Sequence, residues 1–389
     1  MNRSVIAGLT LMAIFQGVRA ALRGRAAQRA ERWQHPSAPA AWPSVSIILP
    51  AWRERGTLES CLTRLRKIDY EDYEVIVVAG GPDGTFKAAN RSARHDPRIT
   101  VMRQRATGGK NGAINDGARR ASKEVLVFID ADALVTREWL KALVAPLADG
   151  YDGGLYDAST GKYAPVRRTL ISEVGEMSQV LENEARGRVI LQGSGGMAVR
   201  RSAFDAIGGI PEGRYADDWA LSARLQEQGY RLAYAPGAFE YTERPATLGE
   251  WWANEVRWRR LHLLTLFEVA PGELRTPISA AKALYPYAAA WTVVILTAAA
   301  VVARACRLGY RAAAEVAWAA VVGAVVTREL AGAVETAAYA GQTRWLRTMA
   351  VIPVLTVLGW LASVFATLTT GKAGLHFKGP RSDAAETLA

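Results

Sequence analysis

The sequence has little of what disulfide-rich or zinc-stabilised proteins depend on. It contains two cysteines, Cys61 and Cys306, which stand far apart. Two isolated cysteines make neither a disulfide framework nor a thiolate metal cage, and they fit a reducing compartment. The histidines are also scattered, which argues against a histidine-based zinc site: His35, His95, His262 and His376.

Nucleic-acid-binding motifs are missing as well, although the formal net charge is +11. The chain shows no zinc-finger, RNP or basic-zipper pattern, and no internal repeat or low-complexity tract. The excess of basic residues therefore indicates an anionic membrane face or a phosphorylated substrate as partner, and no nucleic acid.

Half of the chain is hydrophobic while 22% is charged, so the apolar residues must be concentrated in particular stretches. The first runs from Ser4 to Val18 and extends to Leu22 if the Arg19 side chain snorkels. More arginines follow this stretch than precede it. By the positive-inside rule we expect residues 1–22 to be an uncleaved transmembrane anchor with the following chain in the cytoplasm, a signal peptide being the alternative. Residues 23–43 then form a basic Pro/Ala linker.

Further apolar stretches lie near the C-terminus, and we expect transmembrane helices within residues 277–370. Two of the stretches carry no charge, whereas the third contains Glu315: Tyr285–Ala303, Met349–Thr370 and Ala312–Val326. At about 1.5 Å per residue, the first of these is close to the thickness of a bilayer core. Buried helices of a soluble protein are the alternative.

The tail at residues 371–389 poses a conflict. Three C-terminal spans would place it outside the cell, whereas Lys372, Lys378 and Arg381 favour the inside. A further weak crossing or re-entrant segment around Leu330–Ala340 would resolve the conflict.

Between residues 44 and 245, short β-branched runs alternate with amphipathic helices. Strands are predicted at Val45–Leu49, Glu74–Ala79, Ile99–Arg103 and Val125–Ile129, and the main helices at Thr57–Lys67 and Asn111–Ser122. This alternation predicts an α/β domain with a mostly parallel sheet covered on both faces by helices. Residues 246–276 follow as amphipathic interface helices, because Thr247–Phe267 mixes Trp, Arg and Leu as interfacial helices do.

Carboxylates and glycines follow the strands of this predicted sheet, at the edge where α/β domains bind ligands. Asp130 and Asp132 flank one alanine after a strand, and two such carboxylates can hold a hard divalent cation together with substrate phosphates. The alternative is a turn in which one of them caps a helix that begins near Thr136. Gly80–Thr85 is a glycine-rich loop after another strand.

Two further segments are candidates for chemistry. Gly193–Arg201 places four small residues before an apolar strand, which lets a ligand or backbone approach closely, although an ordinary turn has the same composition. Asp217 and Asp218 precede a predicted helix. They can supply a general base whose pKa is raised by like-charge repulsion, or simply complement the helix dipole.

Taken in this order, these elements resemble the family 2 glycosyltransferases with a GT-A fold, in the membrane-integrated branch that includes cellulose, hyaluronan and ceramide glucosyl transferases. The resemblance covers Val45 to about Arg260. It implies a Rossmann-like GT-A catalytic domain that moves a sugar with inversion from a nucleotide-diphosphate donor, with Mg²⁺ or Mn²⁺ as cofactor. The expected acceptor is a lipid, a lipid-linked sugar or a growing glycan at the cytoplasmic face of the plasma membrane. A processive polysaccharide synthase and a non-catalytic nucleotide-sugar-binding membrane module are the alternatives.

The resemblance also implies roles for single residues on the donor side. Pro50, Ala51 and Glu54 look like the Pro-Ala-x-Asn-Glu loop that holds the nucleoside, with Arg53 in place of Asn. Lys110 is expected near the donor diphosphate, in an element similar to Gly-Lys-x-x-Ala-x-Asn: Gly109, Lys110, Ala113 and Asn115. Asp130 and Asp132 match the Asp-x-Asp metal motif, which implies that Asp132 binds the metal and that Asp130 also supports the donor.

On the acceptor side, Asp217 and Asp218 resemble the catalytic Glu-Asp pair, which makes Asp218 the base. Arg257 and Trp258 match the end of the QxxRW motif and imply Arg257 on the diphosphate and Trp258 against the acceptor. Gly195, within the run of small residues, is expected beside the acceptor.

Two departures from the family pattern affect the donor. The usual Asp-Asp-Gly-Ser-x-Asp-Gly-Thr element reads Val-Ala-Gly-Gly-Pro-Asp-Gly-Thr here, so only Asp83 remains of the carboxylates that contact the nucleoside. The leading Gln of QxxRW is replaced by the shorter Asn254. The sequence therefore leaves the donor base open.

Overall fold

The protein is described by a computed structural model over residues 13–26, 39, 41–105, 108–149, 156–185, 189–213, 216–269, 277–306 and 311–369. An 8-stranded sheet runs in the order β3-β2-β1-β4-β7-β6-β8-β5. Its strands are β1 (Val45–Trp52), β2 (Tyr73–Gly80), β3 (Ile99–Arg103), β4 (Val125–Phe128), β5 (Leu134–Val135), β6 (Ala158–Pro165), β7 (Met197–Arg200) and β8 (Leu232–Thr242). The first four pair in parallel, whereas β7 pairs antiparallel with both β4 and β6.

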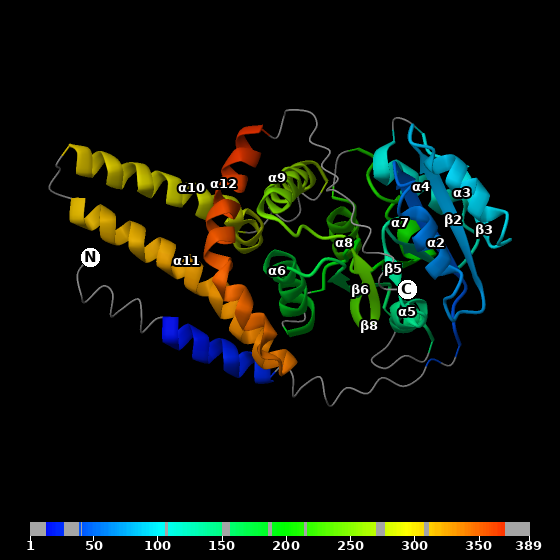
Figure 1. Cartoon of the computed structure of the whole chain (residues 1–389), viewed down its shortest axis with the longest axis horizontal. Coiled ribbons are helices and arrows are strands. Elements are labelled where there is room, and N and C mark those ends of the chain that lie inside the picture. Colours follow the sequence, from blue (N-terminus) through cyan, green and yellow to red (C-terminus); the bar gives the residue numbers. More distant parts are fainter. Residues whose placement is uncertain are drawn as a thin grey trace.

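Helices cover both faces of this sheet, as the alternating pattern predicts (Figure 1). Because side chains alternate along a strand, Ile47 and Leu49 of β1 join one core cluster while Ile48 joins the other. The covering helices are α2 (Leu58–Leu65), α3 (Thr85–Ala93), α4 (Gly109–Arg120), α5 (Trp139–Val144), α7 (Arg201–Ala206) and α8 (Asp217–Glu227), with a 3₁₀ turn η1 (Ala145–Leu147). The prediction of a mostly parallel, helix-covered α/β sheet is confirmed.

Several predicted boundaries were wrong by a few residues. β1 and β2 each continue one to three residues beyond the predicted end, and α4 begins at Gly109 rather than Asn111. The helix after the Asp-Ala-Asp element begins at Trp139, not near Thr136, because β5 intervenes and pairs antiparallel with β8.

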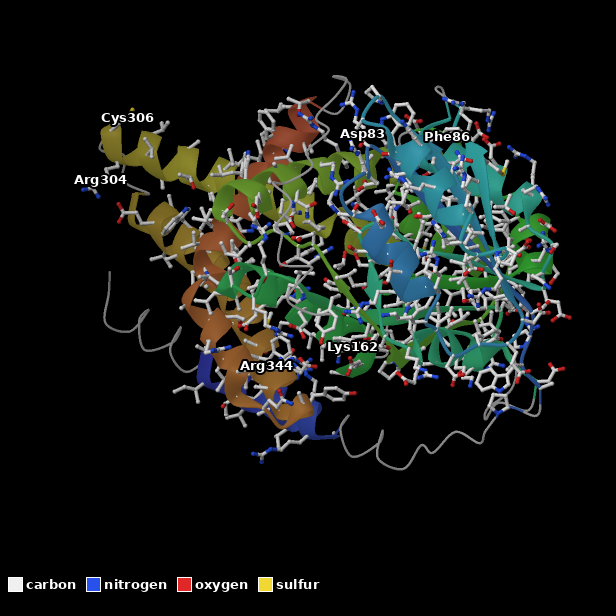
Figure 2. All side chains as sticks on the ribbon, turned by 45° about the vertical axis from the view of Figure 1, so that its right-hand side comes forward. Asp83, Phe86, Lys162, Arg304, Cys306 and Arg344 are labelled. Atoms are coloured by element: carbon white, nitrogen blue, oxygen red, sulfur yellow. The ribbon has the colours of Figure 1, made fainter. Side chains whose placement is uncertain are left out.

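Three long helices form a bundle at the opposite end of the molecule from the sheet (Figure 1). They are α10 (Pro277–Ala305), α11 (Arg311–Ala340) and α12 (Ile352–Thr369), with a 3₁₀ segment η5 (Thr343–Ala350) between the last two. Each contains a stretch long and apolar enough to cross a membrane: Ala283–Ala305, Ala314–Ala340 and Ile352–Thr369. Figure 2 shows Arg304 and Cys306 at the end of α10 that points away from the sheet domain.

The middle span differs from its prediction. Ala312–Val326 is only the first half of a single helix, and Leu330–Ala340 continues it rather than forming a further crossing. Glu315 near its start and the Arg328-Glu329 pair interrupt the apolar pattern. The pattern therefore predicts two separate segments where the structure has one continuous helix. The tail at 371–389 lies outside the described residues.

The N-terminal anchor prediction falls partly outside the described residues, which begin at 13. A helix at 13–26 lies beside α11 (Figure 1), where Arg23 Nη2 contacts Glu335 Oε2 at 3.0 Å. A Cβ at Gly24 would lie 2.2 Å from the Glu335 carbonyl oxygen, so this glycine permits the close approach of the two helices.

Two further helices lie between the sheet and the bundle: α6 (Leu170–Gln179), extended by a π-helical turn η2 (Val180–Ala185), and α9 (Leu248–Leu264), extended by η3 (Thr265–Val269). α9 packs along α12, where Arg260 Nε donates to Thr369 Oγ1 at 3.0 Å. α6 meets η5 through ion pairs, with Glu173 bound to Arg347 and Glu176 bound to Arg344. These two helices connect the sheet domain to the bundle.

Candidate active site

A lysine joins two carboxylates at the centre of the site. Lys110, in the first turn of α4, places its Nζ 2.7 Å from Asp130 Oδ1 and 2.8 Å from Asp217 Oδ2. Asp130 follows β4, and Asp217 begins α8. Pro50 and Gly193 line the same narrow recess, so five of the residues singled out in the sequence meet there.

Asp218 lies beside this group and is buried, with 8% of its surface exposed. Its Oδ1 accepts the backbone N–H of Trp219 at 2.8 Å, and its Oδ2 accepts that of Gly193 at 3.5 Å. Burial and the charge of Asp217 raise the pKa of Asp218 to about 6, against the opposing effect of Lys110. A carboxylate with this pKa is ionised at neutral pH and basic enough to accept a proton.

Glu240, in β8, is a carboxyl group of the site that the sequence analysis missed. The residue is fully buried. Among the described residues neither carboxyl oxygen makes a hydrogen bond of normal geometry, although the backbone N–H of Gly195 lowers the pKa of this group. Burial, reinforced by the charges of Asp130 and Asp132, raises the pKa of Glu240 well above its usual value, which favours the protonated form of this group. The available signal was its alternation within the strand: Glu240 shares the buried face with Ala238 and Thr242.

The residues present fit a divalent cation. The Lys110 ammonium already lies between two carboxylates, which shows that the site holds positive charge. Neighbouring carboxylates contribute to the raised pKa values of Asp218 and Glu240, and a cation at Asp130 and Asp132 would relieve that repulsion. Within the described ranges no three Asp, Glu, His or Cys side chains already form a metal cage. Oxygens of a phosphate substrate would therefore complete the coordination, as is usual for Mg²⁺.

Arg257, on α9, adds positive charge to the site. Its Nη2 donates to Asn254 Oδ1 at 2.9 Å, so the shorter amide that replaces Gln holds the guanidinium from its own helix. Arg257 interacts electrostatically with Asp130 and Asp218. Its Nε is buried and has no hydrogen-bond partner among the residues that the structure describes. Trp258 is 40% exposed, and consecutive helical side chains project about 100° apart, so it faces a different direction from Arg257.

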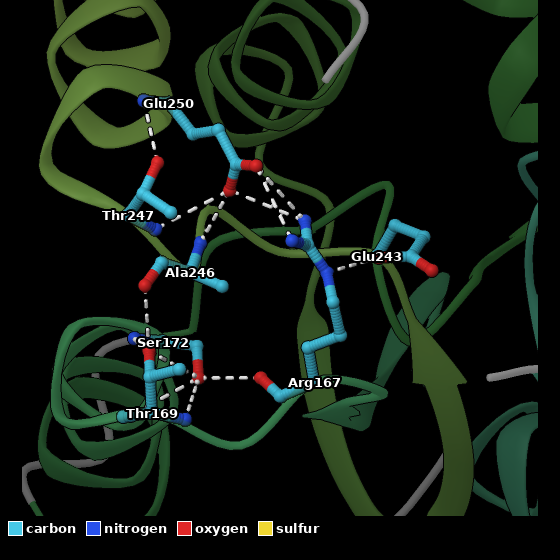
Figure 3. Close-up of polar contacts among 7 residues, drawn as sticks. All are labelled: Arg167, Thr169, Ser172, Glu243, Ala246, Thr247 and Glu250. Carbon is cyan, nitrogen blue, oxygen red and sulfur yellow. Dashed lines mark hydrogen bonds and ion pairs between the residues drawn. The ribbon is translucent and has the colours of Figure 1, made fainter. Parts of the chain in front are cut away.

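The position of α9 is set by an ionic network at its start, two turns before Arg257 (Figure 3). Arg167 Nη2 lies 3.2 Å from Glu250 Oε2, and its Nε lies 3.3 Å from Glu243 Oε2. Glu250 also accepts the backbone N–H of Ala246 at 2.7 Å. This buried carboxylate therefore anchors the first turn of α9 to the sheet and to the loop before α6.

The predicted nucleoside-binding residues gather at the ends of β1 and β2. Ala51 is buried within β1, and the Glu54 backbone N–H donates to Thr85 Oγ1 at 2.8 Å. Asp83 accepts from Thr85 N at 3.1 Å and from Arg55 N at 3.2 Å, which folds the glycine-rich loop against the loop after β1. In this arrangement Asp83 holds the loop in shape. Figure 2 shows it next to Phe86, at the upper edge of the sheet domain.

Arg53 has a φ of 59°, the only positive φ of a non-glycine residue in the described part of the chain. Asn is enriched several-fold in this left-handed conformation. The backbone therefore keeps the conformation that the family's usual Asn favours at this position.

Gly195 has a φ of 96°, and its carbonyl accepts from Trp139 Nε1 at 3.1 Å. A Cβ at Gly195 would lie 2.6 Å from the backbone of Gly161, in β6. The run of small residues thus allows two backbone segments to touch beside the site. An acceptor beside Gly195 stays a prediction.

Comparisons with known proteins agree with this fold. Residues 46–208 match the family model of Glycosyl transferase family 2. The chain is 25% identical over 233 residues to the Probable glycosyltransferase YdaM of Bacillus subtilis (strain 168), covering 56% of this chain and 55% of that protein. It is 26% identical over 225 residues to the Poly-beta-1,6-N-acetyl-D-glucosamine synthase of Staphylococcus aureus (strain MSSA476), covering 55% and 53%. The chain thus spans about half the length of the curated relatives it matches.

One solved structure is similar over nearly its whole length. The Mannosyltransferase PcManGT from Pyrobaculum calidifontis, in complex with GDP-Man and Mn²⁺, is 25% identical with a TM-score of 0.62. The similarity covers 94% of this chain and 98% of that one. Residues 46–208 therefore match glycosyltransferase family 2, in a domain with the GT-A fold that is joined to three helices long and apolar enough for membrane integration.

Proposed function

We propose that the protein is an inverting glycosyltransferase that moves a sugar from a nucleotide-diphosphate donor to a lipid or lipid-linked acceptor at the cytoplasmic face of the plasma membrane. The observation that carries this proposal is the group at the sheet edge. There Lys110 bridges Asp130 and Asp217, and Asp218, with its raised pKa, lies next to them.

In the proposed reaction, an acceptor hydroxyl oxygen attacks the anomeric carbon of the donor sugar. A new C–O bond forms as the bond between that carbon and the diphosphate oxygen breaks, and the nucleoside diphosphate leaves with the bond electrons. The hydroxyl proton passes to a carboxylate oxygen of Asp218, whose pKa of about 6 suits a general base near neutral pH. Attack opposite to the leaving group inverts the anomeric configuration.

Lys110 and Arg257 are placed to stabilise the departing diphosphate. Both bring positive charge to the carboxylate-lined recess, and charge that is already positioned needs no reorganisation during the reaction. A Mg²⁺ or Mn²⁺ ion would be held by Asp132 with support from Asp130, and it supplies electrostatic stabilisation of the diphosphate when bound. The complex of PcManGT with GDP-Man and Mn²⁺ supports this donor class and metal dependence.

The helices support a membrane-borne acceptor. α6 and α9 lie between the site and the bundle, so the site faces the end of the molecule that would meet the bilayer (Figure 1). The arginines after the proposed anchor favour a cytoplasmic catalytic domain.

A processive polysaccharide synthase is the second candidate, favoured by the likeness to the Staphylococcus aureus synthase. An extrusion channel needs an enclosed lining of helices. In the spans that the structure describes, the apolar windows are 17%, 18% and 39% buried, and α10 and α11 extend away from the catalytic domain. This open arrangement favours transfer to a lipid.

The test is transfer of labelled sugar from UDP-, GDP- and dTDP-sugars to a membrane lipid extract by the purified protein in detergent. We expect a lipid-soluble labelled product with an anomeric configuration opposite to that of the donor. Asp218→Asn should abolish it while donor binding persists. A product with retained configuration, or full turnover by the folded Asp218→Asn variant, would contradict the mechanism.

A further inference from the structure

The site contains an arginine that the proposed transfer does not use. Arg244 lies two residues after β8 and is half-buried. None of the ion pairs in the described part of the chain involves it. A guanidinium group binds carboxylates and phosphates in a planar, two-pronged geometry. The charge of Arg244 acts on the carboxyl groups of Asp130 and Glu240, but neither of them forms an ion pair with it, so its hydrogen-bond donors can take an anionic ligand.

The guanidinium is held in place by two contacts, with Tyr163 and with Ser194. Its Cζ lies 4.6 Å from the centre of the Tyr163 ring, and its Nη1 lies 3.5 Å from Ser194 Oγ. Gly175 of α6 is also close, since a Cβ added there would lie 3.6 Å from Nη2. Tyr163 is itself fixed, because its hydroxyl donates to the Gly175 carbonyl at 3.1 Å.

This position is next to the proposed base. Gly193 donates its backbone N–H to Asp218, and the adjacent Ser194 contacts Arg244. Two consecutive loop residues therefore join the base to this arginine. An anion bound at Arg244 would hold the rest of its molecule within reach of Asp218.

The position also differs from that proposed for the donor diphosphate. Lys110 on α4, the carboxylates after β4 and at the start of α8, and Arg257 on α9 serve that group. Arg244 contacts Ser194, in the loop before β7, and lies close to Gly175 of α6, a helix that Figure 1 shows between the sheet and the bundle. The charges of Arg244 and Arg257 repel each other, so two separate anions, or one anion shared between them, would relieve the repulsion.

We infer that Arg244, Ser194 and the Tyr163 ring form a subsite for a phosphate group carried by the lipid acceptor. This inference rests on the proposed function, because it names the acceptor class of the same site. The phosphate would accept hydrogen bonds from Arg244 and Ser194, and its lipid chain would extend toward α6 and the bundle.

The test is equilibrium binding to the purified full-length protein in detergent, a readout that needs no turnover. Two matched pairs of probes separate the sources of the phosphate: farnesyl monophosphate with farnesol, and phosphatidate with diacylglycerol. The phosphorylated member of one pair should bind at least about 10-fold more tightly than its neutral partner, as expected for charge-assisted hydrogen bonds. Arg244→Met should abolish this difference, and Arg244→Lys should restore part of it.

The matched control is Arg231→Met. Arg231 stacks on Tyr156 at the same 4.6 Å, but it precedes β8 at the opposite end of the strand. This variant should bind the phosphorylated probes like the wild type. Inorganic phosphate should compete with them in the wild type, which keeps the test decisive if Arg244→Met does not fold.

The inference is overturned if phosphorylated and neutral probes bind the wild type equally, or if Arg244→Met leaves the preference intact. A loss of nucleotide binding equal to the loss of phosphate-probe binding would place Arg244 at the donor instead. The wild type could bind phosphorylated probes more tightly than neutral ones, in a way that depends on Arg244, and yet turn over no donor. That result would contradict the proposed function and support the phosphate subsite.

Discussion

The Nζ of Lys110 lies 2.8 Å from Asp217 Oδ2 and thereby connects α4, which packs on the parallel half of the sheet, to α8, which follows the antiparallel β7. Opposite charges from the two halves of the domain meet above the carboxyl end of β4, and Asp218 lies next to them. The ionisation of the proposed base should therefore depend on both partners of this ion pair.

The pH dependence of transfer tests this relationship. Asp218 must be ionised to accept a proton, so kcat/KM should fall below an apparent pKa of about 6. Asp217 raises the pKa of Asp218 and Lys110 lowers it. In pH profiles of residual activity, Asp217→Asn should move the acidic limb to lower pH and Lys110→Met should move it to higher pH. Shifts in the same direction would contradict the electrostatic assignment.

The stability of Asp218→Asn should increase with pH relative to the wild type. Folding raises the pKa of Asp218 to about 6, so the stability contributed by the protonated form is fully present below about pH 4 and is lost as the pH rises through 6. Asn resembles the protonated acid at every pH. We expect similar thermal unfolding at about pH 3.5 and a more stable variant at about pH 8, by up to about 3 kcal/mol. A variant less stable than the wild type at pH 8 would argue against a strained buried carboxylate.

The contact between Gly195 and Gly161 predicts a position-specific effect of alanine. Gly195→Ala must adopt a positive φ and place its Cβ 2.6 Å from the Gly161 backbone, so stability and transfer should both fall sharply. Gly208→Ala is the matched control, because Gly208 also has a positive φ, at 73°, but has nothing within 4 Å of the added Cβ. The control should lose only about 1–2 kcal/mol and remain active. Equal losses in the two variants would show that the close contact is unimportant.

The junction between α6 and η5 should stabilise the whole protein. Glu176 is 2% exposed and binds both Arg168 and Arg344, whose guanidinium groups remain partly hydrated. Glu176→Gln should therefore lower the thermal midpoint by the equivalent of about 1–3 kcal/mol. In a double-mutant cycle with Arg344→Met, the two effects should be non-additive.

The control cycle for this junction uses the exposed ion pair between Asp72 and Lys123. Exposed pairs of this kind contribute about 0–1 kcal/mol, so its coupling should be smaller. A coupling at the junction no larger than at this exposed pair would mean that hydrophobic contacts alone hold α6 to η5.

The parallel half of the sheet was predictable because its buried strands are continuous runs of β-branched residues. β3 is predicted to the residue. The start of α4 was predicted too late, because two glycines at its first turn are poor helix formers and Gly109 adopts a φ of 61°. β5 is too short, at 2 residues, to produce a pattern of its own.

The site residues that belong to a local sequence motif were predicted. The site residues that only the tertiary structure brings to the site were missed. Asp130 and Asp217 stand in recognisable elements, and the fold brings them to one lysine. Glu240 and Arg244 stand in or just after a strand, where a charged residue suggests a solvent-exposed face. The pairing of β8 with β6 and β5 instead places Glu240 inside the domain, beside the Asp-x-Asp element.

The most direct test of the account is donor hydrolysis by the purified, detergent-solubilised protein, with UDP-, GDP- and dTDP-sugars and with Mn²⁺, Mg²⁺ or EDTA. We predict metal-dependent release of one nucleoside diphosphate, lost in Asp132→Ala although that variant stays folded. Release that is unchanged in EDTA or in Asp132→Ala, or no release from any donor even with membrane lipid extract added, would contradict the assignment of a metal-dependent glycosyltransferase.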